Sequence, residues 1–80
     1  MRLVIKHEVN PVRGGYLARS TQMRVAAQGY NEQTAKANLE RTVQLFLAPL
    51  EREGILQEEL RKMGVTFEEI DGSGLVILLS

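Results

Sequence analysis

Residues 31–53 read NEQTAKANLERTVQLFLAPLERE and carry the clearest helical pattern of the chain. Asn31 is a residue type that caps the N-termini of helices, and Gly54, directly after this segment, is typical of a helix end. The apolar residues recur three or four positions apart, at Ala35, Leu39, Val43, Phe46, Leu47 and Leu50. This spacing predicts an amphipathic helix that lays one face on a core.

Two details of this helix concern its ends. Pro49 removes a hydrogen bond to the preceding turn, which costs about 3 kcal/mol or kinks a helix. The helix therefore either bends at Pro49 and continues to about Glu53, or ends near Ala48. At the start, Tyr30 and Ala35 have the spacing of a hydrophobic staple around the N-cap.

The residues before this helix predict three strands. Apolar and polar side chains alternate over residues 2–9, and two further strands are expected over 16–20 and 23–28. The sequence NPVRGG at 10–15 is typical of a turn because proline fixes φ and glycine permits positive φ. The connections are short, so we expect an antiparallel meander with the long helix packed on one face.

The residues after the helix predict a short helix over 55–63, a strand over 65–70, a DGSG turn at 71–74 and a last strand. That last strand, LVILL at 75–79, is apolar on both faces. A strand of this kind is either central in its own sheet or covered by another chain. We expect its five residues to be buried, mostly at a subunit interface: Leu75, Val76, Ile77, Leu78 and Leu79.

Length and composition place the chain among small α+β proteins. Its 80 residues form one predicted domain, 1–80, in which 1–54 is a βββα core and 55–80 is an extension of a helix and one or two strands. A chain of this size buries only roughly 60–65% of its unfolded surface, and without cysteine it has no disulfide to stabilise it. We therefore expect a homo-oligomer, a dimer or tetramer, with a well-packed monomer as the alternative.

The sequence indicates a soluble, cytoplasmic protein. No apolar stretch approaches the ~20 residues of a membrane span, and the N-terminal apolar run is too short for a signal peptide. The net charge is zero, but residues 1–30 hold five basic and one acidic side chain, whereas residues 31–80 hold five basic and nine acidic ones. This asymmetry marks either a nucleic-acid face or a basic sheet beside acidic helices.

No residue pattern in the chain predicts catalysis. His7 is the only conventional base, and no nucleophile motif accompanies it. The acidic residues lie in adjacent or near-adjacent pairs typical of solvated surfaces, and neither a phosphate-binding loop nor metal-ligand spacing is present. We therefore expect no enzyme, no metal and no cofactor. For nucleic acid, Tyr16 with Arg19 and Arg24 would form one weak candidate face.

Three segments resemble the HicB antitoxin family over about residues 1–54. Gly14-Gly15-Tyr16 is similar to the Gly-Gly-aromatic start of the family's second strand. Residues 28–35, QGYNEQTA, are similar to its helix start, and residues 38–47, NLERTVQLFL, to the helix that follows. The family's Pro- and Cys-containing stretch between strands two and three is replaced here by STQMRV at 20–25, and residues 55–80 differ from its usual C-terminal DNA-binding module.

The resemblance implies a sheet with one packed helix, as in a partly formed RNase H-like or double-stranded-RNA-domain-like fold. It also implies oligomerisation and capture of a small HicA-type mRNA-cleaving toxin. Our leading hypothesis is a non-catalytic, HicB-like antitoxin module. The alternatives are an RNA- or single-strand-binding domain that uses the basic first half, and a purely structural oligomeric partner domain.

Overall fold

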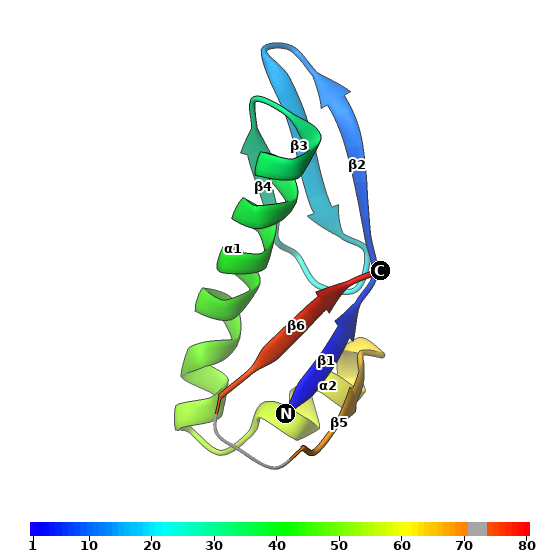
Figure 1. Cartoon of the computed structure of the whole chain (residues 1–80). Coiled ribbons are helices and arrows are strands. Elements are labelled where there is room, and N and C mark those ends of the chain that lie inside the picture. Colours follow the sequence, from blue (N-terminus) through cyan, green and yellow to red (C-terminus); the bar gives the residue numbers. More distant parts are fainter. Residues whose placement is uncertain (71–73) are drawn as a thin grey trace.

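The computed structural model describes residues 1–70 and 74–80 and shows an α+β fold (Figure 1). Two helices accompany six strands, which form two small three-stranded sheets. In chain order the elements are β1 (Arg2–Ile5), β2 (His7–Val12), β3 (Gly15–Ser20), β4 (Ala26–Gly29), α1 (Glu32–Arg52), α2 (Leu56–Met63), β5 (Thr66–Glu68) and β6 (Val76–Leu79).

The first sheet has the strand order β2-β3-β4, with both pairs antiparallel. Alternate side chains of β3 face α1, and Ala18 on this side is completely buried. The turn into β3 uses Gly14 at φ +83°, a backbone conformation that side chains disfavour. At Gly15 any Cβ would overlap the carbonyl oxygen of Gly29, so glycine is required for the close approach of the two chain segments.

The long helix α1 begins where the sequence predicts. Asn31 is its N-cap, and the side-chain oxygen accepts a hydrogen bond from the backbone N–H of Thr34 at 2.7 Å. The helix continues through Pro49 to Arg52, so it does not end near Ala48. Tyr30 remains 79% exposed, and the predicted staple with Ala35 is therefore wrong.

The second sheet has the order β5-β1-β6. β5 runs antiparallel to β1, and β6 runs parallel to it. The helix α2 precedes this sheet in the chain and ends at Gly64, whose φ of +73° is the left-handed conformation of a helix C-cap. Leu56 and Leu60 of α2 are buried in the core.

The segment predicted as one strand over residues 2–9 is divided between the two sheets. Lys6 separates β1 from β2, because its backbone N–H donates to the side chain of Gln22 and its carbonyl accepts from the N–H of Thr21. β2 then continues to Val12, beyond the predicted start of the turn. Pro11 is tolerated there because β2 is an edge strand and needs no N–H at that position.

The observed bounds of two other strands also differ from the predicted ones. The third strand begins at Ala26 and not at Met23, since residues 21–25 form a bent connection in which the Met23 side chain is buried. The strand predicted over 65–70 is limited to Thr66–Glu68. Of the predicted DGSG turn, residues 71–73 lie outside the described residues.

One continuous hydrophobic core joins both sheets. Its completely buried large side chains come from β1 and from both helices: Leu3, Ile5, Leu39, Val43, Leu47 and Leu60. α1 contacts β3 and β4 with its first half and reaches β6 with its later turns (Figure 1). Neither described helix is both long and apolar enough to cross a membrane.

Candidate binding surfaces

The predicted nucleic-acid residues Tyr16, Arg19 and Arg24 do not form one face. Tyr16 is half-buried and packs against the core, on the side of β3 that Ala18 shares. Arg19 is an odd number of positions away on the same strand, so its side chain points to the opposite face. Arg24 lies in the connection between β3 and β4. The structure therefore brings Arg19 and Arg24 together and leaves Tyr16 apart.

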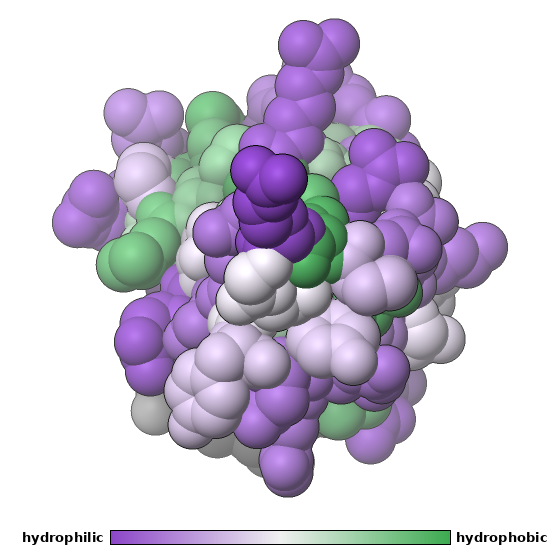
Figure 2. Space-filling model, turned by 90° about the horizontal axis from the view of Figure 1, so that it is seen from above, coloured by the Kyte–Doolittle hydropathy of each residue, from purple (hydrophilic) through white to green (hydrophobic). Residues whose placement is uncertain are grey.

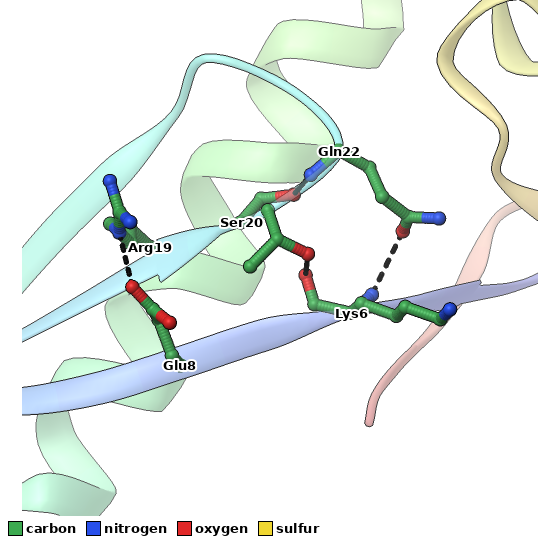
Figure 3. A network of polar contacts seen from close by, with 6 residues as sticks. Lys6, Glu8, Arg19, Ser20 and Gln22 are labelled. Atoms are coloured by element: carbon green, nitrogen blue, oxygen red, sulfur yellow. Dashed lines mark hydrogen bonds and ion pairs between the residues drawn. The ribbon is translucent and has the colours of Figure 1, made fainter.

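An open depression of about 600 Å³ follows the β3–β4 connection, and residues 19–26 line it. Ser20 shapes this loop because its buried hydroxyl accepts hydrogen bonds from the N–H groups of Gln22 (3.1 Å) and Met23 (3.2 Å). Nε of Arg19 donates to Oε1 of Glu8 at 2.6 Å (Figure 3), which balances the Arg19 charge. Arg24 makes no ion pair within the described part of the chain.

Gln22 connects three parts of the molecule next to this depression. Its Oε1 accepts from the N–H of Lys6 at 2.9 Å (Figure 3), and its Nε2 donates to the carbonyl oxygen of Gly64 at 2.7 Å. The side chain therefore joins the break between β1 and β2 to the C-terminal end of α2. Together with the Thr21–Lys6 hydrogen bond, these contacts hold the β3–β4 connection against the point where β1 passes into β2.

His7 makes a structural contact. Its Nδ1 lies 2.9 Å from the main-chain oxygen of Ser80, which can only accept, so Nδ1 carries the proton and donates. The N–H of His7 donates to the same oxygen at 3.0 Å. Across residues 1–70 and 74–80, no three His, Cys, Asp or Glu side chains are grouped so that they could hold a metal ion.

A second depression, of about 390 Å³, is acidic. Glu51 at the end of α1 and Glu69 after β5 line it together with Met1, Leu56 and Gln57. Gln57 donates a hydrogen bond from its amide to the Glu69 carboxylate. The N-terminal ammonium is its one basic group among the described lining residues and donates to the carbonyl of Gly74 at 3.1 Å.

The end of the molecule that carries the β2–β3 turn and the start of α1 is largely hydrophilic. In Figure 2, which views the molecule from above, polar residues cover most of the surface, and apolar residues occupy limited areas between them. Val12 and Tyr30 at this end are among the exposed large apolar side chains. A depression of about 230 Å³ lies along the β2–β3 turn, and three of its seven described lining residues are glycines.

The predicted interface strand is covered on one face only. Within β6, Ile77 is buried at 6% exposure, whereas Val76 and Leu78 are 44% and 45% exposed. Leu75 and Leu79 are half-buried and pack against the core. The reason is that the core formed with α1 and α2 lies on one face of this sheet, whereas no described element packs on the other face.

The uncovered side of this sheet forms a continuous surface, which we call the outer face. Val4 of β1 pairs with Leu78 of β6 and with Thr66 of β5, and Arg2 pairs with Val76 and Glu68. The guanidinium of Arg2 forms an ion pair with the Glu68 carboxylate. A depression of about 140 Å³ adjoins this pair, with Val4, Thr66 and Phe67 among its lining residues.

Several of these residues were absent from the sequence-based candidates. Val4 interrupts the alternation of the first strand, and this irregularity was the available signal for an apolar outer face. Glu51 and Glu69 are far apart in the chain, so only the fold brings them together. Gln22 lies in a polar connection, and nothing in its local sequence indicates a link to Lys6 and Gly64. Comparisons with known protein families, curated proteins and solved structures found no match.

Proposed function

We propose that this chain is a non-catalytic binding module similar to HicB antitoxins, which self-associates and captures a HicA-type mRNA-cleaving toxin. The observation that carries the proposal is the packing of the motif segments on one another. Tyr16 pairs with Gly29 across β3 and β4, and Gly15 lies against the carbonyl of Gly29. A Cβ on Gly29 would in turn overlap the backbone of Ala35 in the first turns of α1.

These contacts explain why glycine occurs at positions 15 and 29 of the motif segments. Both glycines allow the start of β3, the end of β4 and the start of α1 to approach within backbone contact, and Asn31 then caps the helix. The antiparallel order β2-β3-β4 under a long helix supports the partial RNase H-like or double-stranded-RNA-domain-like arrangement that we propose for this part of the chain.

Charge complementarity directs a basic toxin to the acidic depression. Glu51 and Glu69 are both exposed there, and the N-terminal ammonium is the one basic group among the described lining residues, so the carboxylates are in excess. The depression along the β3–β4 connection has the opposite character, because Arg19 and Arg24 line it and would repel a basic partner.

Co-expression with a small basic toxin encoded next to this chain tests the proposal. We expect a purified complex and relief of growth arrest. Glu51→Lys should weaken the complex, whereas Glu40→Lys, an exposed charge reversal on the same helix, should leave it intact. Absence of both complex and neutralisation would overturn toxin capture, and equal effects of the two variants would overturn the assignment to the acidic depression.

A second candidate function is nucleic-acid binding, because Arg19 and Arg24 converge on one open depression. Phosphate contacts strengthen as salt falls, so an RNA or single-stranded DNA ligand should bind at low ionic strength. Arg24→Ala should weaken this binding more than Arg13→Ala, which removes a charge from the β2–β3 turn. No binding at low salt would exclude this function. If the toxin also fails to bind, a purely structural oligomeric partner domain is the function that remains.

A further inference from the structure

We infer that the outer face of the β5–β1–β6 sheet is covered by the same face of a second copy of this chain. The inference rests on the self-association in the proposed function and is independent of toxin capture. Three apolar side chains meet on this face: Val76 and Leu78 are nearly half exposed, and Val4 lies beside Leu78. Exposed apolar side chains that adjoin on one surface are typical of an interaction site.

The charges on this face favour a second copy over a charged macromolecule. Arg2 and Glu68 are its only charged residues in the described paired strands, and they neutralise each other in an ion pair. A basic toxin or a nucleic acid would gain no net attraction here. An identical face also carries no net charge, so two copies do not repel each other as surfaces of one charge would.

The shape of the chain also indicates a missing partner. The radius of gyration is 12.9 Å, whereas a compact domain of 80 residues has about 11.6 Å. The molecule is elongated and extends over 39 × 24 × 20 Å. Association of two copies through a sheet face would bury apolar surface that the single chain cannot cover.

The outer face is complementary to itself under a two-fold axis. β6 and β5 lie on opposite sides of β1, so the exposed Leu78 and the depression beside Thr66 are about 10 Å apart. An axis parallel to β1 between two such faces places β6 of each copy opposite β5 of the other. The 140 Å³ depression then receives Leu78 from the second copy, since a cavity of about 150 Å³ holds a benzene-sized group.

Light scattering on wild type, Leu78→Glu and Leu45→Glu tests the inference. Both variants place a carboxylate on an exposed leucine, and Leu45 on α1 is the control because it is 70% exposed and away from the outer face. We expect the wild type and Leu45→Glu to have twice the 9.0 kDa mass of the chain. Leu78→Glu should raise the dimer dissociation constant at least about 100-fold, because each dimer would bury two carboxylates.

The outcomes separate this inference from the proposed function. A monomeric wild type would overturn self-association altogether, whereas a dimeric Leu78→Glu would overturn only the assignment to the outer face. Dissociation of Leu45→Glu alone would place the interface on α1.

Val76→Thr is a milder variant that controls for misfolding. Threonine has the shape of valine and also favours strands, so this substitution should leave the fold intact. We expect it to weaken the dimer about tenfold with an unchanged circular dichroism spectrum, and an unchanged dimer would contradict the inference.

Discussion

The two sheets of this protein differ in the chemistry of the faces that their own helices leave open. On the β2-β3-β4 sheet, Glu8 and Arg19 pair on the open face, and Asn10 and Gln28 are exposed there with Leu17 between them. On the β5-β1-β6 sheet, Val4, Val76 and Leu78 lie together on the open face beside the Arg2–Glu68 ion pair. Both sheets pack on one continuous core, so the apolar side chains on the second open face are not the result of incomplete packing of that sheet.

The comparison shows how a binding surface can be recognised without catalytic groups. A solvated sheet face normally alternates apolar inward with polar outward residues, and the first sheet follows this pattern except at Val12, Leu17 and Ala26. The second sheet breaks this alternation at an edge strand that has no charged residue, proline or bulge to discourage association. This departure from the solvated pattern is the observation that supports the proposed interface on the outer face.

The largest expected effect concerns the core that unites the two sheets. Leu60→Ala removes a completely buried side chain under the second sheet and should lower the free energy of unfolding by about 2–5 kcal/mol. Because the core is continuous, amide hydrogen exchange should accelerate equally in β3 and in β1. Leu45→Ala, at an exposed site, should change stability by less than about 0.5 kcal/mol. Faster exchange in β1 alone would show two independent units.

Substitution of glycine tests the close packing of the first sheet on the start of α1. Gly29→Ala should cost about 3 kcal/mol, because its Cβ would overlap the backbone of Ala35 and force β4 away from α1. Gly14→Ala has open space around its Cβ and only a positive φ, so it should cost about 1–2 kcal/mol. Urea denaturation of both variants measures the difference, and equal costs would argue against the tight contact.

Substitution of Gln22, at the junction of the two sheets, should have a smaller effect on stability. Gln22→Glu keeps the acceptor for the Lys6 N–H but loses the donor to the Gly64 carbonyl, which should cost about 1 kcal/mol. Gln22→Ala removes both contacts and should cost more. Thermal unfolding compares the variants, and an unchanged melting temperature in both would show that the junction does not depend on this side chain.

The ion pair on the polar open face should contribute least. Glu8 and Arg19 are both more than 40% exposed, so Glu8→Gln should change stability by less than about 1 kcal/mol and the effect should diminish with added salt. Urea denaturation at low and high ionic strength checks this expectation. A loss well above 1 kcal/mol would mean that the polar face contributes more to stability than its solvation suggests.

The sequence predicted the local elements better than their assembly. The Asn31 cap, the long helix and Gly64 at the end of α2 follow from residue types and spacing, and the structure has them. The division of the first strand depends on Gln22 and Thr21, which bond to Lys6 from a distant loop, and no local pattern records this contact. Likewise, periodicity cannot say whether an apolar strand such as 75–79 is central or at an edge.

The candidate surfaces were predicted in part. Arg19 and Arg24 line one depression, whereas Tyr16 turns inward, because side chains alternate along β3 and α1 covers the side that holds Tyr16 and Ala18. The acidic depression requires the end of α1 to meet the segment after β5, which only the tertiary structure determines.

The most direct test of the account is methyl NMR of the wild-type chain over a dilution series. If a second copy covers the outer face, the methyl resonances of Val4, Val76 and Leu78 should shift with protein concentration. Those of Val12 and Leu45, which are exposed elsewhere, should stay constant. Concentration-independent resonances at a constant monomeric mass, or shifts confined to α1, would contradict the assignment of the outer face as the interface between copies.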